Sequence, residues 1–165
     1  MAAGSTYTPI ATTTLGSAQA TVTFSSLGSY TDIVLVMQAK NSAGDSNVRL
    51  RFNSDTGSNY SSTFLDGNGT SAFSSRTTSA TFAYLDNYGQ IGNNFNSNII
   101  VNIMNYGNST TYKTIISRAN NAAMGVDAIV SLWRNTGAIT SLTLSQGGNN
   151  FDTGSTFTLY GIAAA

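Results

Sequence analysis

Three apolar runs separated by polar turns occupy residues 126–162. In the second and third runs, residues 139–144 and 155–160, apolar and hydroxyl side chains mostly alternate. Alternation with a period of two is typical of a strand with one buried face and one wet face. The segments between the runs are rich in Gly and Asn, which tolerate positive φ angles. This part of the chain is therefore predicted to be packed antiparallel β structure.

The same pattern recurs upstream. Residues 47–52 alternate strictly, which predicts an inward face of Val48, Leu50 and Phe52 and outward Arg49 and Arg51.

Residues 30–39 form the most apolar run of the chain. The run is too short to cross a membrane and predicts a central strand covered on both faces.

Short strands at regular intervals, with no convincing helix between them, indicate an all-β fold. About ten strands at a spacing of roughly 10–15 residues predict a two-sheet antiparallel sandwich, jelly-roll-like, with nearly no helix. At 165 residues the chain has the length of one domain. We expect residues 1–10 to form an N-terminal arm and edge strand, because proline cannot donate to a central ladder, and residues 11–165 to form the sandwich.

Composition excludes several functional classes. Charged residues make up 8% of the chain and the formal net charge is zero, which argues against nucleic-acid binding through clustered Lys and Arg. No apolar run is long enough for a membrane span, and the chain has no cysteine for disulfides or thiolate chemistry. We therefore expect neither nucleic acid nor membrane as a partner.

Candidate catalytic chemistry is sparse. The chain has no histidine, so a His-based triad or general base is excluded, and its seven acidic residues are dispersed aspartates. No spacing forces a paired-carboxylate site, although a glycosidase could assemble one from distant loops. Residues 53–57 faintly resemble a calcium loop but lack its glutamate, so an Asx-rich loop is favoured. We expect no enzyme activity, no catalytic or metal-binding residues and no cofactor.

Several aromatic residues lie in or beside predicted loops and strand ends. They could stack on sugar rings, although packing against neighbouring residues is the favoured interpretation; they are Tyr84, Tyr88, Phe95, Tyr106 and Tyr112.

Three stretches, residues 30–40, 48–61 and 139–162, together resemble the β-sandwich virion structural proteins of tailed bacteriophages. These proteins occur as head decoration proteins, head fibres and tail-associated domains. The closing GSTFTLYGI, residues 154–162, is the most specific of the three stretches. The resemblance implies a structural role on a virus particle, and it supplies no catalytic motif.

Two functions follow as hypotheses. The first is a capsid decoration or cement subunit that binds and stabilises the head surface, with the major capsid protein or other virion proteins as partners. Such a subunit would be made in the host cytoplasm, would lie on the surface of the virion, and would be a homo-oligomer, with a trimer favoured. The alternative is a tail or fibre tip module that binds host surface glycans.

The first ten residues supply the candidate partner contacts. Tyr7 and Ile10 offer anchors, and Pro9 lowers the entropic cost of ordering the arm. Deletion of residues 1–10 is expected to leave a folded domain that no longer docks on undecorated particles, as measured by its occupancy on them. Full occupancy at unchanged affinity would place attachment on the faces or loops of the sandwich instead.

Overall fold

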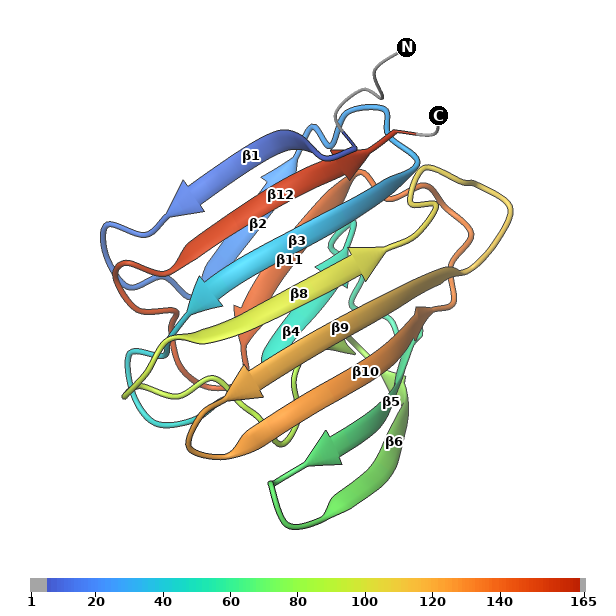
Figure 1. Cartoon of the computed structure of the whole chain (residues 1–165). Coiled ribbons are helices and arrows are strands. Elements are labelled where there is room, and N and C mark those ends of the chain that lie inside the picture. Colours follow the sequence, from blue (N-terminus) through green and yellow to red (C-terminus); the bar gives the residue numbers. More distant parts are fainter. Residues whose placement is uncertain (1–5, 164–165) are drawn as a thin grey trace.

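The computed structural model describes residues 6–163, which form twelve β-strands and no helix. The strands build two antiparallel sheets of eight and four strands that pack face to face (Figure 1). The predicted all-β sandwich is confirmed. None of the described residues forms a helix of the length and apolarity that a membrane crossing needs.

The large sheet contains most of the chain. Its strands, in spatial order, are β1 (Thr8–Thr14), β12 (Thr156–Ile162), β3 (Asp32–Ala39), β8 (Ser97–Ile103), β9 (Lys113–Asn121), β10 (Gly125–Trp133), β5 (Tyr60–Gly67) and β6 (Ala72–Ala80). The small sheet contains, in order, β2 (Thr21–Ser25), β11 (Ser141–Gln146), β4 (Val48–Phe52) and β7 (Ala83–Tyr84). The first and last strands lie side by side in this sheet, because β1 pairs with β12.

The core lies between the sheets and follows the period-two pattern. On β4 the alternation is as predicted: Val48, Leu50 and Phe52 are fully buried. The guanidinium groups of Arg49 and Arg51 lie on the other side of the strand, 4.3 and 5.7 Å from the ring centre of Phe82. Arginine stems cover apolar surface while their charged heads stay near water.

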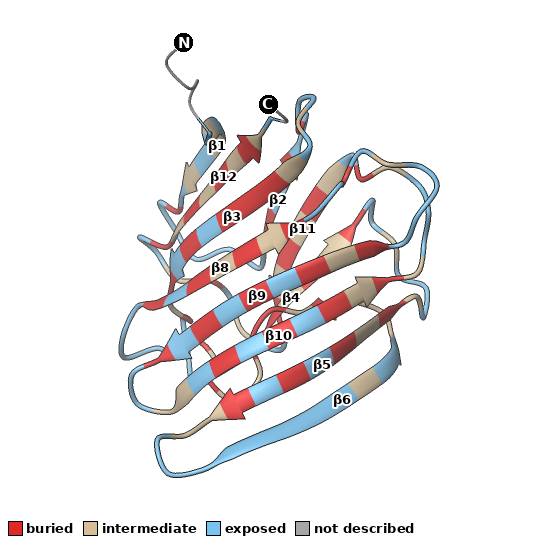
Figure 2. Ribbon diagram, turned by 45° about the vertical axis from the view of Figure 1, so that its right-hand side comes forward, coloured by how far each residue is buried: buried red, intermediate tan, exposed pale blue. Residues whose placement is uncertain are grey.

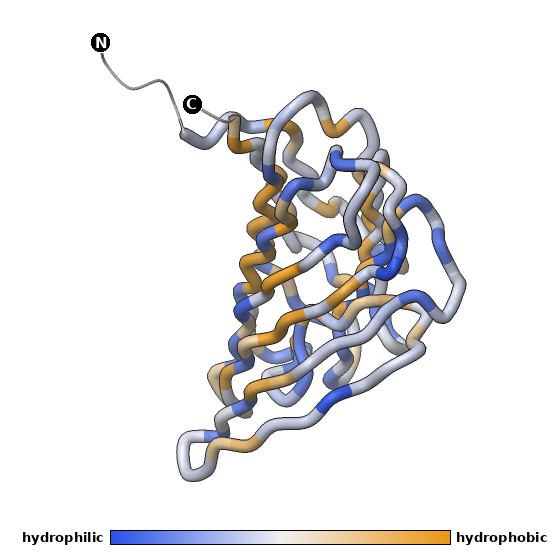
Figure 3. The backbone as a smooth tube through the Cα atoms, turned by 90° about the vertical axis from the view of Figure 1, so that its right-hand side faces the viewer, coloured by the Kyte–Doolittle hydropathy of each residue, from blue (hydrophilic) through white to orange (hydrophobic). Residues whose placement is uncertain are grey.

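The prediction for residues 30–39 was wrong for one face. β3 is central in its sheet, and Ile33, Leu35 and Met37 on its inner face are fully buried. On the other face Val36 is 37% exposed and Gln38 is exposed. No second layer of the described chain covers that side of the large sheet, as the edge-on view shows (Figure 3).

β6 was not predicted from the sequence. None of its nine residues is buried, and β6 is pale along almost its whole length in Figure 2. A strand that buries no side chain has no hydrophobic alternation to reveal it. Its hydrogen bonds to β5 hold it in the sheet. The neighbouring apolar segment, residues 81–85, contains only the short β7.

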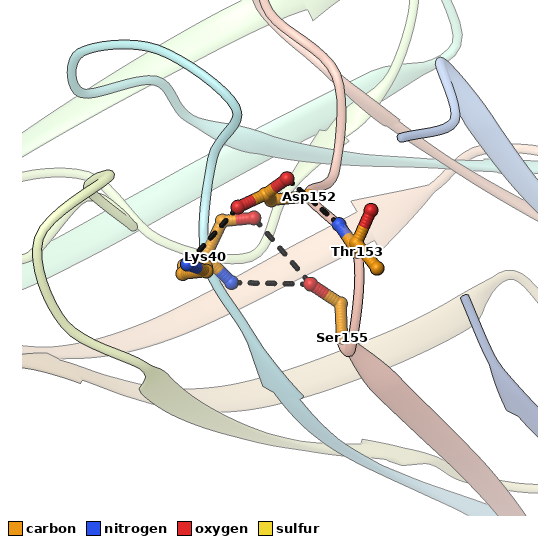
Figure 4. A network of polar contacts seen from close by, with 4 residues as sticks. All are labelled: Lys40, Asp152, Thr153 and Ser155. Atoms are coloured by element: carbon orange, nitrogen blue, oxygen red, sulfur yellow. Dashed lines mark hydrogen bonds and ion pairs between the residues drawn. The ribbon is translucent and has the colours of Figure 1, made fainter. Parts of the chain in front are cut away.

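A small polar network ties the end of β3 to the loop before β12 (Figure 4). The ammonium of Lys40 lies 3.0 Å from a carboxylate oxygen of Asp152, and the hydroxyl of Ser155 accepts from the backbone N–H of Lys40 at 3.3 Å. This is the one ion pair among residues 6–163. Exposed pairs of this kind contribute at most about 1 kcal/mol, so burial of apolar side chains dominates stability.

Trp133 closes the core at one end of β10. Its side chain is 1% exposed, and its ring centre lies 5.3 Å from that of Phe52 and 6.3 Å from that of Tyr60. Its indole N–H donates to Asp55 at 2.7 Å. The ring is therefore packed against strand residues of both sheets.

We predict that Trp133→Ala lowers the free energy of unfolding by about 3–5 kcal/mol, because it removes a large side chain that its neighbours cannot replace. Chemical denaturation measures the loss, and native tryptophan fluorescence of the wild type should be blue-shifted. Trp133→Phe, which keeps an aromatic ring and loses the N–H, should cost less. Emission typical of free tryptophan, with a stability change within about 0.5 kcal/mol for Trp133→Ala, would contradict the burial.

Candidate functional site: the outer face of the large sheet

The fold brings together two carboxylates that the sequence keeps apart. Asp66 on β5 and Asp127 on β10 are direct cross-strand partners, and both point into the sandwich. Sequence reasoning missed this pair. The sequence did contain a signal for Asp127: by the alternation along β10 it falls on the same face as the buried Ile129 and Trp133. A paired carboxylate is the arrangement that glycosidases use, so its surroundings decide what it can do.

Both carboxylates hold the loop that follows β7. The two oxygens of Asp127 accept backbone N–H groups of Asn87, Tyr88 and Gly89 at 2.7–3.2 Å. Asp66 accepts the side-chain amide of Asn87 at 2.8 Å. Each carboxylate residue is 4% exposed, so the loop covers the pair. The geometry is that of an anchor for the loop.

Asp86 completes this anchor from the loop itself. It is fully buried and accepts the backbone N–H groups of Val48 at 2.7 Å and Ile91 at 3.1 Å. Burial raises the pKa of Asp86 well above its ordinary value. Burial also raises the pKa of Asp66 to about 6, and the neighbouring carboxyl of Asp127 adds to the effect.

The predicted Asx-rich loop at residues 53–57 is confirmed. Asp55 accepts the backbone N–H of Gly57, the side-chain amide of Asn59 and the indole N–H of Trp133, all within 2.9 Å. Its oxygens therefore stabilise the loop and the end of β10. Within residues 6–163 no three acidic side chains come together as metal ligands.

The five aromatic residues considered for sugar stacking fall into three environments. Tyr106 is buried and its hydroxyl donates to the carbonyl of Gly28 at 2.7 Å. Tyr84 and Tyr88 are half-buried and pack edge to face on phenylalanines. Phe95 and Tyr112 are 60% and 55% exposed. The structure thus confirms packing for the first three and leaves the last two on the surface, on loops at opposite ends of β8.

The side of the large sheet that faces away from the small sheet, here called the outer face, carries the exposed apolar side chains. Five of them are between 37% and 58% exposed: Val36, Leu65, Ile116, Val126 and Val130. Cross-strand register places them in neighbouring positions. One row is Val36, Ile100, Arg118, Ala128 and Leu65, and the next is Val34, Asn102, Ile116, Val130 and Thr63. The apolar positions therefore form one patch across five strands.

A broad, open hollow of about 730 Å³ lies on the same face where β9, β10, β5 and β6 meet. Its outward-pointing lining residues are Leu65, Gly67, Ala72, Ser74, Arg118, Val126 and Ala128. Four of these residues are small, namely Gly67, Ala72, Ser74 and Ala128, and the hollow lies above them. No residue of the loop that covers the inner face lines it. A second hollow of about 200 Å³, beside Asn98 and Asn120, shares Arg118 with the first.

The predicted contact residues of the arm lie at the other edge of the outer face. Tyr7 is 53% exposed, and its ring packs edge to face on Tyr160 at 6.1 Å. Pro9 is the exposed cross-strand partner of Tyr160, whereas Ile10 packs against the core. The boundary drawn after residue 10 falls inside β1, so the arm's last three residues belong to the sheet. Residues 1–5 lie outside the described part of the chain.

Comparison with known proteins yields no family. No protein-family model matches the chain, and no curated protein matches it in sequence. Among solved structures, galectin LEC-6 of Caenorhabditis elegans is similar with a TM-score of 0.32 and 11% identity, over 93% of this chain and 96% of that one. A mutant of alginate lyase Aly36B in complex with alginate trisaccharide has a TM-score of 0.37 and 9% identity, over 92% and 80%. At these TM-scores neither likeness says what this chain does.

The buried carboxylates predict how stability depends on pH. Burial raises the pKa of Asp66 from 3.8 to about 6, so the folded state holds its proton more tightly than the unfolded chain does. This contribution to stability is complete below about pH 4 and is lost as pH rises through about 6. In Asp66→Asn, the unfolding free energy measured by denaturant titration should therefore fall less steeply over this interval than in the wild type.

Asp86, whose pKa is also raised by burial, contributes slope of the same sign in Asp66→Asn. The lowered pKa values of Asp55 and Asp152 contribute slope of the opposite sign in both proteins. Asp45→Asn is the matched control, because Asp45 is exposed. Identical pH slopes for the wild type and Asp66→Asn would contradict this assignment.

Proposed function

We propose that the protein is a virion structural subunit, most specifically a capsid decoration or cement protein, that docks on a neighbouring virion protein through the outer face of its large sheet. The observation that carries the proposal is the apolar patch on that face. The resemblance to β-sandwich virion proteins of tailed bacteriophages supplies the kind of partner.

The patch has the composition of an interface centre. Five exposed apolar side chains lie on β3, β9, β10 and β5, and the half-buried Ile100 of β8 joins Val36 to the others. Strand spacing gives the patch a width of roughly 19 Å. Single exposed apolar residues are ordinary on a protein surface, but a contiguous patch marks a binding surface. Threonine and asparagine side chains surround it, including the hydrogen-bonded threonine pairs between β1 and β12. An apolar centre with a polar rim is the usual anatomy of a protein–protein interface.

The run in β3 that the sequence predicts to be covered on both faces supports the same conclusion. The described chain buries its inner face and leaves Val36 on the outer face in solvent. A docked partner would bury the apolar side chains that the described chain leaves exposed on this face. The alternative from the sequence, a module for host glycans, has weaker support, because the exposed rings of Phe95 and Tyr112 belong to separate loops.

We predict that Val130→Asp abolishes docking, because it places a charge in the middle of an apolar interface and leaves it without a partner there. Purified protein is added to particles of the virus that encodes it, assembled without this subunit, and occupancy is measured by electron microscopy. Val130 is 49% exposed in the isolated chain, so the variant should fold normally, which circular dichroism checks.

Thr21→Asp is the matched control. Thr21 is an exposed residue of β2 on the small sheet, so the same charge on the opposite side of the molecule should leave occupancy unchanged. If the Val130→Asp variant reached the same occupancy as the wild type, the outer face would not be the docking surface. Analytical ultracentrifugation of the wild type tests the homo-oligomer, for which a trimer is proposed.

A further inference from the structure

Five of the seven basic residues of the chain are engaged by the chain's own groups. Lys40 is paired with Asp152. Arg49 and Arg51 stack on Phe82. Lys113 is buried and donates to the carbonyls of Thr111 and Thr136, and Arg134 donates to the carbonyl of Ser58.

The remaining two basic residues both lie on the outer face. Arg118 on β9 and Arg76 on β6 are exposed, and their guanidinium groups make no hydrogen bond or ion pair with residues 6–163. On β8, β9, β10, β5 and β6, no aspartate points to the outer face, because Asp66 and Asp127 point inward. This part of the outer face is therefore positive in a protein whose net charge is zero.

We propose that Arg118 is the charged anchor of this docking surface and that it binds a carboxylate of an acidic polypeptide segment on the partner. The inference rests on the proposed function and names the chemistry of its partner. Arg118 lines both hollows of the outer face. A guanidinium binds a carboxylate through two parallel hydrogen bonds, and apolar walls around it strengthen the pair by excluding water.

Arg76 extends the same preference along the face. Arg76 lies three strands away from Arg118 and is displaced by two residues along the strand direction. This corresponds to roughly 16 Å between their backbones. A partner segment that crosses the strands can therefore meet both guanidinium groups if its own acids are similarly spaced. Like-signed charges on a nearly neutral protein also orient the encounter, so their effect depends on salt.

The occupant that the surface favours is a polypeptide, not an acidic polysaccharide. The one ring that lines the larger hollow, Phe73 of β6, is 39% exposed, but it lies on the opposite face of its strand from Arg76 and packs edge to face on Tyr88. Instead, Leu65, Val126 and Val130 expose aliphatic side chains near Arg118. Aliphatic and small residues around one charge suit apolar side chains with a carboxylate among them.

The first experiment measures occupancy on particles that lack this subunit, over salt concentrations from roughly 50 mM to roughly 500 mM. Arg118→Gln should weaken binding about tenfold and flatten its salt dependence, because it removes one desolvated charge pair. Arg118→Lys keeps the positive charge but loses the planar guanidinium group, so its affinity should lie between those of the wild type and Arg118→Gln. Arg51→Gln changes net charge equally on the small sheet, away from the outer face, and should bind like the wild type.

The second experiment needs no particle. Poly-L-glutamate and polygalacturonate are titrated separately into the purified full-length chain, and backbone amide shifts are followed by NMR. Poly-L-glutamate should shift amides around Arg118 on β8, β9, β10 and β5, and Arg118→Gln should abolish these shifts. Tighter binding of polygalacturonate at the same amides would overturn the polypeptide assignment in favour of an acidic polysaccharide. No shift with either polymer would overturn the anchor role.

The two experiments separate failure of the inference from failure of the proposed function. If Val130→Asp abolishes occupancy while Arg118→Gln binds with wild-type affinity and salt dependence, the docking face stands and the anchor falls. If the wild type does not bind the particles but poly-L-glutamate still shifts amides around Arg118, the anion site stands and the virion role falls.

Discussion

The pleated backbone gives every strand of the large sheet two faces, and residues 6–163 provide a covering layer for only one of them. The inner face packs against the four strands of the small sheet and holds the apolar core. The outer face has the same backbone and hydrogen bonds but no second layer. Much of what distinguishes this molecule follows from that asymmetry. A sheet with apolar side chains on an uncovered face retains surface whose burial is favourable, so the face can contribute free energy to an association.

The buried carboxylates show how the inner face accommodates polar groups where the core ends. Asp127 accepts three consecutive backbone N–H groups of the loop after β7. Asp86, in the same loop, accepts two more, one from Val48 of β4 and one from Ile91 of the loop itself. Buried backbone donors without partners destabilise a fold, so these acids allow an irregular loop to lie over strand residues. The raised pKa values of Asp66 and Asp86 show that this arrangement opposes ionisation. Asp66, Asp86 and Asp127, which seemed dispersed in the sequence, therefore hold this loop in place.

Alternation made the fold class predictable, because β4, β11 and β12 bury one face each and their sequences show it. It failed at β6, whose hydroxyl-rich residues bury nothing. It also failed for β3, where continuous apolarity suggested cover on both sides. The sequence shows that Val36 is apolar, but it does not show whether this side chain is buried by the same chain or by a partner. The candidate site could not be predicted for the same reason: cross-strand register, which no local pattern encodes, places Arg118 between Ile100 and Ala128.

The sheet edges help to explain why the face, and not an edge, is the surface offered to a partner. The β1 edge contains Pro9, which has no N–H to donate, and its register shifts between Pro9 and Ala11. The β6 edge carries Arg76 and an irregularity opposite Tyr60 and Ser62, near the positive φ of Ser79. Proline, charge and bulges are devices that prevent edge strands from pairing with other chains. With both edges of the large sheet blunted, strand addition is disfavoured, and association through side chains of the outer face is the route that the fold leaves open.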